Sequence, residues 1–454
     1  MRLLAAATVV LIALSGCGSD DAAEDRGDTY DFGAAPQAPA GEGLGSEDAR
    51  AAVRSAVVGS LDTRALDRLA ESGDARQAWI VSDLLRFTQA GAEEQTLVRA
   101  FERLTGRSPR KDPQFAESPW LSITNHLIAW DLPAPPGYVA AKAELFTALE
   151  PGWRPFFADK DAEIDWRLVS WGGVGIDDRR AGDSDPCPQG CIPALDDPEL
   201  TSAREGDWYP DGEIVFGVVV GSEALALPRN IMEVHEMVNL TLGGRRLGIP
   251  YCTLCGSAQA YFTDTGPRGR PPALLRTSGL LSRSNKVMYD LRTRSVMDTF
   301  TGRALSGPLH DAGVELDQAT VVASTWGAWK RAHPTTRIIA RDGGIGRTYP
   351  RDPLGDRDDD GPIFPTGPVD PRLPVQTRVI GVIAPGGEPV AFDAAAARRS
   401  LSRSTAVRAG GVELVADGSG FRARAASGGR SLVAHEAFWF AWSQFHPRSA
   451  VWIP

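Results

Sequence analysis

Two cysteines separated by two residues, Cys252 and Cys255, are the strongest candidates for chemistry in this sequence. At this spacing both sulfur atoms can face a common point, which suits a soft metal ion or a reversible disulfide. His235 and Glu236 come shortly before the pair, and one imidazole with two thiolates forms a ligand set for copper or zinc, with copper preferred. Glu236 could support the imidazole or accept a proton. The candidate metal ligands are therefore Cys252, Cys255 and His235, and the catalytic candidates are Cys252, Cys255 and Glu236.

Three interpretations of the cysteine pair stay open at this stage. The first is the soft-metal site, and the second is a thiol–disulfide oxidoreductase that uses Cys252 and Cys255. The third is a non-catalytic binding or assembly module in which the two sulfurs form a static bridge, as cysteines of exported proteins often do. For His235 an imidazole packed at a helix–sheet contact is the ordinary alternative. Whether the chain is an enzyme is therefore undecided.

Two further segments carry possible ligands. Cys187 and Cys191 bracket a polar Pro-Gln-Gly loop, and a disulfide between them is a simpler account than half of a four-cysteine zinc site. The acidic stretch from Asp356 to Gly361 starts like a calcium loop, but Gly367 stands where the bidentate acid should close it. The sequence therefore favours a disulfide at the first segment and argues against calcium at the second.

The amino terminus predicts export. Arg2 precedes an apolar run from Leu3 to Leu14 that is too short to span a bilayer and is typical of a secretory signal. The run closes with Leu14-Ser-Gly-Cys17, which resembles a lipobox and implies cleavage before Cys17 and lipidation of its thiol. Residues 1–17 are thus predicted as a lipoprotein signal peptide, with the protein held by acyl chains at the cell membrane or outer membrane. Residues 18–45, rich in Ala, Gly, Asp, Glu and Pro, are predicted as a disordered tether.

Composition limits the remaining possibilities. The chain has 454 residues, which is too long for one ordinary core and predicts two domains. A hydrophobic content of 43% and twelve Trp indicate a globular protein. The net charge of -10 and the lack of a basic stripe argue against nucleic acid as a partner. Protein partners cannot be inferred from these data.

The predicted elements fall into two classes. Apolar residues recur with helical spacing through residues 46–160, which predicts a helical domain that packs its own core. Beyond this segment the pattern alternates, and Ile214 to Val220 is predicted as a buried strand. Asn230 to Leu240 is predicted as a helix that carries His235 and Glu236. The fold class is therefore α+β, a helical N-terminal domain followed by a larger mixed α+β domain over residues 165–454.

The larger domain contains an internal echo. The segment Trp326 to Pro334 and the segment Trp439 to Pro447 both read Trp-x-Ala-Trp-x-x-x-His-Pro. A weaker echo joins Val215–Glu223 to Val379–Glu388 in the same order, which indicates a possible internal duplication. The second copy has neither Cys nor His at the places that correspond to the candidate metal ligands. The shared scaffold does not need those groups.

Several motifs together resemble one family. Tyr251-Cys-Thr-Leu-Cys-Gly-Ser257, His235-Glu-x-x-Asn239 and the run from Ser278 to Asp290 resemble domain-of-unknown-function family 3179, DUF3179, over about residues 165 to 454. The resemblance implies a fold unit and a site but no reaction. Besides the cysteines, His235 and Glu236, the residues predicted to line the site are Asn239, Tyr251, Asn285, Met288, Tyr289 and Asp290. Among them, Asn285 could hold a ligand and Met288 could bind copper.

Overall fold

The computed structural model describes residues 30–39, 45–187, 190–266, 269–355, 357 and 361–454. The predicted lipidation site Cys17 and most of the acidic loop at 356–360 lie outside the described residues. Within those ranges, no helix has both the length and the apolar character needed to cross a bilayer.

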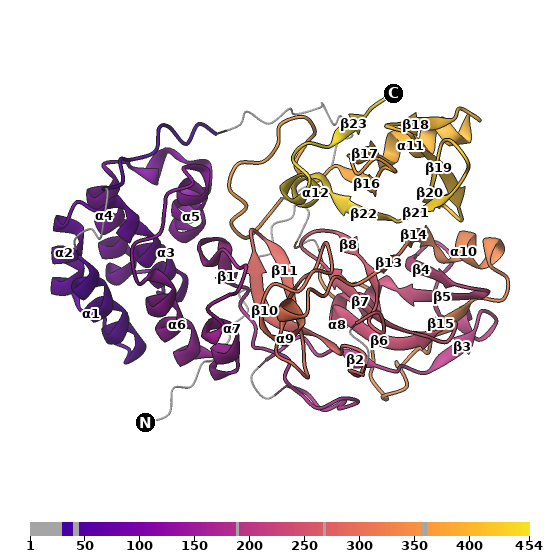
Figure 1. Ribbon diagram of the computed structural model, residues 1–454, viewed down its shortest axis with the longest axis horizontal. Helices are drawn as coiled ribbons and strands as arrows, with labels where there is room; N and C mark the ends of the chain where they lie inside the picture. Colours follow the sequence, from indigo (N-terminus) through magenta and orange to yellow (C-terminus); the bar gives the residue numbers. More distant parts are fainter. Residues whose placement is uncertain (1–29, 40–44, 188–189, 267–268, 356, 358–360) are drawn as a thin grey trace.

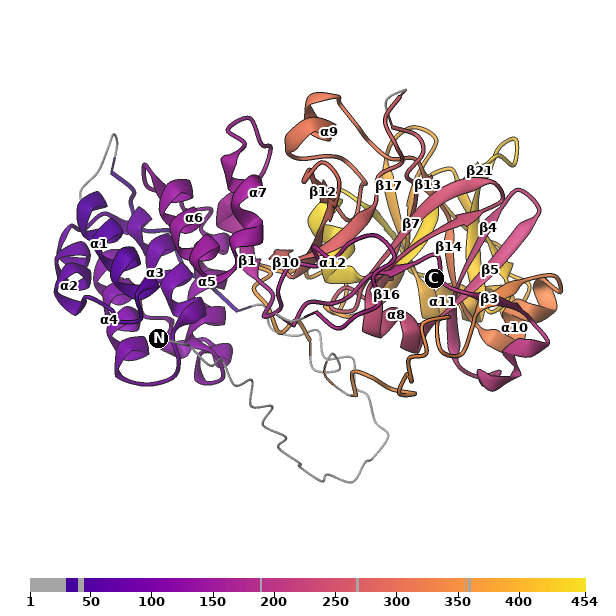
Figure 2. The ribbon, with the colours of Figure 1, turned by 90° about the horizontal axis from the view of Figure 1, so that it is seen from below.

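The N-terminal region is helical, as predicted. Seven α-helices gather at one end of the molecule, and the sheets occupy the other end in both views (Figure 1, Figure 2). They are α1 Ser46–Val57, α2 Thr63–Glu71, α3 Ala78–Phe87, α4 Ala92–Thr105, α5 Pro119–Ala129, α6 Tyr138–Leu149 and α7 Arg154–Ala158. Local signals set their ends: the Asp62 carboxylate accepts hydrogen bonds from two backbone amides of α2, and Gly106 ends α4 in the left-handed conformation.

The apolar core of the helical region extends beyond the helices. Its apolar cluster continues into the sheet domain, where it includes Leu280, Val287 and Tyr289. The indole of Trp153 donates a 2.7 Å hydrogen bond to the carbonyl of Ser278 across the same boundary. The helices therefore brace one hairpin of the sheet domain, which carries residues of the candidate site described below.

Part of the predicted tether also contacts the helices. The hydroxyl of Tyr30 lies 3.3 Å from Nε2 of His126, and the indole of Trp130 donates to the carbonyl of Phe32 at 3.0 Å. Residues 30–33 thus pack against the C-terminal end of α5.

The prediction of a mixed α+β domain is wrong. From residue 169 onward the chain forms five small sheets in a propeller-like arrangement, and the helices between them are short. The first twelve strands are β1 Val169–Trp171, β2 Leu195–Asp196, β3 Leu200–Ser202, β4 Ile214–Val220, β5 Glu223–Pro228, β6 Met237–Leu242, β7 Arg245–Cys252, β8 Ser257–Ala258, β9 Ala260–Phe262, β10 Leu275–Ser282, β11 Asn285–Asp290 and β12 Val296–Asp298. The others are β13 Gln318–Ala319, β14 Val321–Thr325, β15 Arg337–Ile339, β16 Arg378–Ile383, β17 Pro389–Asp393, β18 Val407–Ala409, β19 Val412–Asp417, β20 Gly420–Ala425, β21 Ser431–Leu432, β22 Ala434–Phe438 and β23 Ala450–Trp452. The helices are α8 Arg229–His235, α9 Gly307–Asp311, α10 Trp326–Ala332, α11 Ala394–Ser402 and α12 Trp439–Phe445.

The helix predicted over residues 230–240 is also wrong in its second half. Helix α8 ends at His235, because Glu236 takes a left-handed φ of 50° and the chain leaves as strand β6. The sequence from Met237 to Leu242 alternates in a way that suits a strand, and all but one of these residues are buried. Short helices joined directly to strands explain why helical periodicity overestimated the helix content.

The two echoing segments form units of the same connectivity. In the first unit (residues 214–339) one sheet has the order β14-β4-β5-β15, and in the second unit (residues 378–452) it has the order β22-β16-β17-β23. In each, the last strand pairs in parallel and the other pairs are antiparallel. The companion sheets, β13-β9-β7-β6 and β21-β20-β19-β18, also correspond strand by strand. The echo in the sequence therefore corresponds to a repeated architecture.

Two segments of the first unit have no counterpart in the second. Strands β19 and β20 are joined by Gly418 and Ser419 alone, whereas β7 ends at Cys252 and is separated from β9 by a longer segment that carries Cys255 and β8. The segment β10–β12 with α9 stands between β9 and β13, where the second unit passes directly from β20 to β21.

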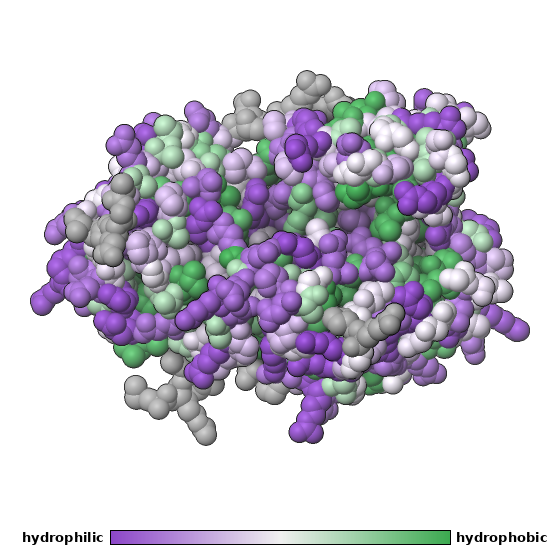
Figure 3. All heavy atoms as spheres, in the orientation of Figure 1, coloured by the Kyte–Doolittle hydropathy of each residue, from purple (hydrophilic) through white to green (hydrophobic). Residues whose placement is uncertain are grey.

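The face in Figure 3 is mostly hydrophilic, with hydrophobic residues in small scattered groups.

Candidate functional site

The cysteine turn (residues 252–257) closes the end of strand β7. Cys252 is the last residue of β7 and lies opposite Ser257 of β8 in the antiparallel ladder. Cys252 and Cys255 are joined as a disulfide. Cys252 is 3% exposed and Cys255 is 0% exposed, within an apolar cluster that includes Phe300 and Trp442. Both residues are buried, and Cys252 is the less deeply buried of the two.

The added hairpin β10–β11 reaches the cysteine turn from one side. Its two-residue turn has a positive φ at Arg283 and at Ser284, 47° and 67°, and this places Asn285 at the start of β11. Oδ1 of Asn285 lies 3.1 Å from Sγ of Cys255. Nδ2 of Asn285 donates to the carbonyl of Arg283 at 3.1 Å and to the side chain of Gln444 at 2.6 Å. The amide orientation of Asn285 is thus held by two bonds, and its oxygen faces the sulfur.

A buried ion pair between Lys286 and Glu236 is connected to the cysteine turn by a hydrogen bond. Nζ of Lys286 lies 3.0 Å from Oε2 of Glu236 and also donates to the carbonyl of Glu236 and to Oγ1 of Thr277. The other carboxylate oxygen of Glu236 accepts a 2.9 Å hydrogen bond from Thr253, which stands between the two cysteines. Burial lowers the pKa of Lys286, and the neighbouring Glu236 carboxylate opposes this effect. One buried charge pair is therefore linked by hydrogen bonds to the residue next to Cys252.

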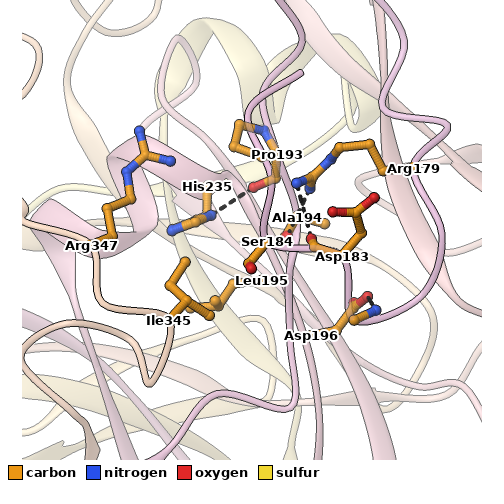
Figure 4. A pocket seen from close by; sticks show the side chains of 11 residues that line it. Arg179, Asp183, Ser184, Pro193, Ala194, Leu195, Asp196, His235, Ile345 and Arg347 are labelled. Atoms are coloured by element: carbon orange, nitrogen blue, oxygen red, sulfur yellow. Dashed lines mark hydrogen bonds between the residues drawn. The ribbon is translucent and has the colours of Figure 1, made fainter. Parts of the chain in front are cut away.

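His235 lies at a different place and does not join the sulfurs. Its Nδ1 lies 2.6 Å from the carbonyl of Pro193 and its Nε2 lies 2.7 Å from the hydroxyl of Tyr349. Figure 4 shows the ring between Arg347 and Arg179, beside a cavity of about 20 Å³, enough for one water molecule. Burial lowers the pKa of His235 to about 4. The predicted set of Cys252, Cys255 and His235 is therefore not assembled as a metal centre.

One other set of possible ligands comes together. In the described part of the chain, only Asp177, Cys187 and Cys191 bring three metal-ligand atoms within 4.8 Å of one another. Cys187 and Cys191 are joined as a disulfide. The carboxylate of Asp177 is bonded by Arg179 at 2.7 Å and by the backbone amide of Ala194 at 2.7 Å. The group is compatible with a metal or a disulfide, and the occupied carboxylate favours the disulfide.

Most of the other predicted lining residues serve the scaffold. Asn239 bonds Asp196 and the backbone of Leu275, and Asp290 caps the turn at Thr293 and binds the amide of Leu274. Tyr289 donates a 2.7 Å hydrogen bond to the carbonyl of Asp177. Met288 packs in an apolar cluster that does not include the cysteines. Tyr251 immediately precedes the cysteine turn, and its ring packs at a tilt against that of Phe216. Of the predicted lining residues, Asn285 is the one that contacts a sulfur.

Sequence reasoning missed three contributors to the site. Lys286 follows Asn285 directly, and a lysine just before the apolar residues Val287 and Met288 of a strand was a signal that could have been used. Thr253 lies inside the Cys-x-x-Cys motif itself. Ser284, whose carbonyl lies 3.7 Å from Sγ of Cys255, carries a buried hydroxyl with no hydrogen-bond partner among the described residues. The contact of Thr253 with Glu236 depends on the left-handed end of α8, which the sequence pattern does not show.

The comparisons with known proteins bear on the same region. A family model described as protein of unknown function (DUF3179) matches residues 189–428, which is more than half of the chain. The chain belongs to the DUF3179 family. The DUF3179 match includes the cysteine turn, the β10–β11 hairpin and α8, and it ends before β22 and α12. No curated protein and no solved structure matches the chain.

Proposed function

We propose that this DUF3179 protein carries out thiol–disulfide exchange at Cys252 and Cys255. The observation that supports this proposal is the convergence of the two segments that only the first unit has. One segment carries the disulfide, and the other brings Asn285 to Sγ of Cys255 and Lys286 to the carboxylate of Glu236, which accepts a hydrogen bond from Thr253 between the cysteines. The second unit keeps the same sheets without any of these groups, so folding of the scaffold does not account for them.

The exchange needs no group beyond the two sulfurs and a substrate dithiol. A substrate thiolate attacks Sγ of Cys252, the Cys252–Cys255 bond breaks, and Cys255 leaves as a thiolate that takes a proton. A second substrate thiolate then attacks its own partner in the mixed disulfide, and Cys252 leaves as a thiolate. The substrate dithiol loses two electrons and two protons and becomes a disulfide. Cys255 takes up one proton, the other goes to solvent, and the reduced protein carries a Cys255 thiol and a Cys252 thiolate. The reverse sequence reduces a substrate disulfide.

The surroundings suit the two sulfurs to unequal roles. The slight exposure of Cys252, 3% against 0% for Cys255, supports Cys252 as the attacked sulfur. Asn285 can accept a hydrogen bond from the Cys255 thiol once the bridge opens. A copper or zinc site at the reduced pair is a weaker proposal, because His235 is bonded elsewhere and does not complete the ligand set.

We also propose that the exchange takes place outside the cytoplasm. The support is the sequence at the amino terminus, where the lipobox-like segment ending at Cys17 predicts a membrane-anchored lipoprotein. Intact mass measurement of the mature protein tests this, with Cys17→Ala as the comparison. A diacylated N-terminal cysteine is expected, and an unmodified start further along the chain contradicts it.

The exchange is tested in a variant that keeps only the relevant pair. We expect Cys187→Ser/Cys191→Ser protein to take up two alkylating groups after equilibration with a dithiothreitol buffer, at a reproducible midpoint. Cys252→Ser and Cys255→Ser in the same background take up no more than one group each. Metal analysis of the same samples tests the copper or zinc alternative. A bridge that resists reduction until the protein unfolds contradicts the proposal and leaves a non-catalytic binding or assembly module.

A further inference from the structure

A buried imidazole of the second unit has no evident structural role. His435 stands on strand β22 and is 7% exposed. Within the described residues its Nε2 is buried without a hydrogen-bond partner. The ring packs against Phe300 at 5.2 Å and against Trp442 at 5.5 Å between centroids. A buried polar nitrogen without a partner costs free energy, so its presence calls for another explanation.

The first unit fills the same position with a valine. Strand β14 runs into Trp326 of α10 as β22 runs into Trp439 of α12, and this alignment pairs His435 with Val322. Val322 is 1% exposed and packs in an apolar cluster with Trp326 and Trp329. An apolar side chain therefore satisfies the packing of this architecture, and the imidazole is an addition of the second unit.

The two units meet along a seam where each presents a turn to the other. The backbone amide of Thr325 donates to Ser419 at 2.8 Å, and the amide of Phe438, which corresponds to Thr325, donates to the carbonyl of Cys255 at 2.8 Å. The cysteine turn thus occupies, in the first unit, the place that Gly418 and Ser419 occupy in the second. Strand β22 contacts β8 as β14 contacts β20.

This correspondence brings His435 to the strand opposite Cys252. A Cβ added at Gly420, the first residue of β20, would lie 2.7 Å from Cγ1 of Val322. The residue in the place of Gly420 is Ser257, the first of β8, and the residue in the place of Val322 is His435. Phe300 and Trp442, which both contact the ring of His435, belong to the same apolar cluster as the cysteines.

Ser257, like His435, is buried and carries a polar atom that lacks a hydrogen-bond partner within the described ranges. It is 0% exposed, and its hydroxyl has no hydrogen-bond partner in the described part of the chain. It lies directly opposite Cys252 in the β7–β8 ladder, where cross-strand side chains stand about 5 Å apart. Ser257 therefore lies opposite Cys252, the correspondence with Gly420 and Val322 places His435 next to Ser257, and both side chains carry a polar atom without a partner among the described residues.

We propose that His435 and Ser257 are positioning residues that donate hydrogen bonds to the Cys252 thiolate of the reduced protein. This inference rests on the proposed exchange at the cysteine turn. A disulfide sulfur is a weak acceptor, whereas a thiolate is a strong one, so the two donors gain their partner only when the bridge opens. Burial lowers the pKa of His435 to about 3, so the imidazole is neutral and acts through an N–H group. The redox state of the pair then decides whether both groups are satisfied.

The test uses the residue that the first unit itself supplies. We expect His435→Val, in the full chain with Cys187→Ser/Cys191→Ser, to shift the equilibrium with a dithiothreitol couple about tenfold toward the disulfide, the effect of losing one hydrogen bond to a charged group. His435→Gln keeps an N–H donor, so its equilibrium should stay close to that of the parent. Ser257→Ala shifts the equilibrium in the same direction. Val322→Ala, the matched change in the first unit, lowers stability but leaves the equilibrium unchanged.

The outcomes separate this inference from the proposed function. A bridge that cycles in the parent protein with the same equilibrium in His435→Val overturns the roles of His435 and Ser257 and leaves the exchange standing. A shift of equal size in Val322→Ala shows a general effect of core packing and also overturns them. A parent bridge that does not cycle overturns both proposals together.

Discussion

Sγ of Cys255 and Oδ1 of Asn285 lie 3.1 Å apart across the cysteine turn. An amide oxygen only accepts hydrogen bonds, and a disulfide sulfur carries no proton to give. The contact becomes a hydrogen bond only when Cys255 is a thiol. Because the Nδ2 group of Asn285 is already bonded to Arg283 and Gln444, its oxygen stays directed at the sulfur.

Removing that acceptor should disfavour the dithiol. We expect Asn285→Leu to shift the equilibrium of the Cys252–Cys255 pair about fivefold toward the disulfide, the effect of one neutral hydrogen bond. The measurement is alkylation and mass analysis after equilibration in dithiothreitol buffers. Gln444→Ala removes only the bond that orients the amide and should have a smaller effect. Equal shifts in the two variants would show that Asn285 acts through packing alone.

The ion pair of Glu236 and Lys286 should show strong coupling. Glu236→Gln leaves a buried ammonium without its counter-ion, and Lys286→Met leaves a buried carboxylate, so each should lower the free energy of unfolding by about 3–5 kcal/mol. The double variant removes both charges and should lose clearly less than the sum. Urea unfolding of the four proteins gives the coupling energy. Additive losses would show that the two charges do not depend on each other.

The repeated units predict equal sensitivity at two glycines. Gly217 of β4 lies under the indole of Trp329, and Gly381 of β16 lies under that of Trp442, with no room for a Cβ in either place. Gly217→Ala and Gly381→Ala should each destabilise the protein by about 1–3 kcal/mol through overpacking. Gly212→Ala, at an open position, should stay within about 0.5 kcal/mol of the parent in thermal unfolding. A neutral effect at only one of the two covered glycines would contradict the equivalence of the units.

Acid should destabilise the protein through His235. The pKa of His235 is lowered from 6.5 to about 4 by burial, so below pH 6.5 the unfolded chain binds more protons than the folded one. Its contribution is fully present above pH 6.5 and is lost as pH falls to 4, by about 3 kcal/mol. His435 and His446 act in the same direction. His235→Gln should flatten part of this dependence in urea unfolding from pH 7 to 4, and curves parallel to those of the parent would contradict the prediction.

The cysteine pair could be identified from sequence because its chemistry is local. Two residues separate Cys252 from Cys255, so any backbone turn brings their sulfurs together. The same reasoning failed for His235, although it is adjacent to Glu236 in sequence. The left-handed φ at Glu236 ends α8 between them, and the imidazole goes to Pro193 and Tyr349 while the carboxylate goes to Thr253. A single backbone angle therefore separated the predicted ligands.

The prediction of the fold class was wrong for a related reason. Over a stretch as short as two helical turns, the sequence pattern of one continuous helix resembles that of a short helix joined directly to a strand. Helix α8 is joined to β6 in this way, and α10 to β14. The seam between the units was beyond sequence analysis altogether. Lys286 and His435 can be recognised as candidate site residues only once the β10–β11 hairpin and strand β22 are known to lie beside the cysteine turn. The Trp-x-Ala-Trp echo was visible in the sequence because the same indole must cover a glycine in each unit.

The parallel closure of the first unit sets an order for assembly. Strand β15 must pair with β5, and more than a hundred residues, including both sulfurs, lie between those strands. Contacts of such long range form slowly, whereas a loop of four residues closes almost at once. The two sulfurs can therefore meet while the chain is still open, before β22 covers the cysteine turn. Once β22 has docked, the redox state of the buried pair is fixed until the exchange reaches it, so a molecule that folds with the bridge closed would begin its first turnover by accepting electrons.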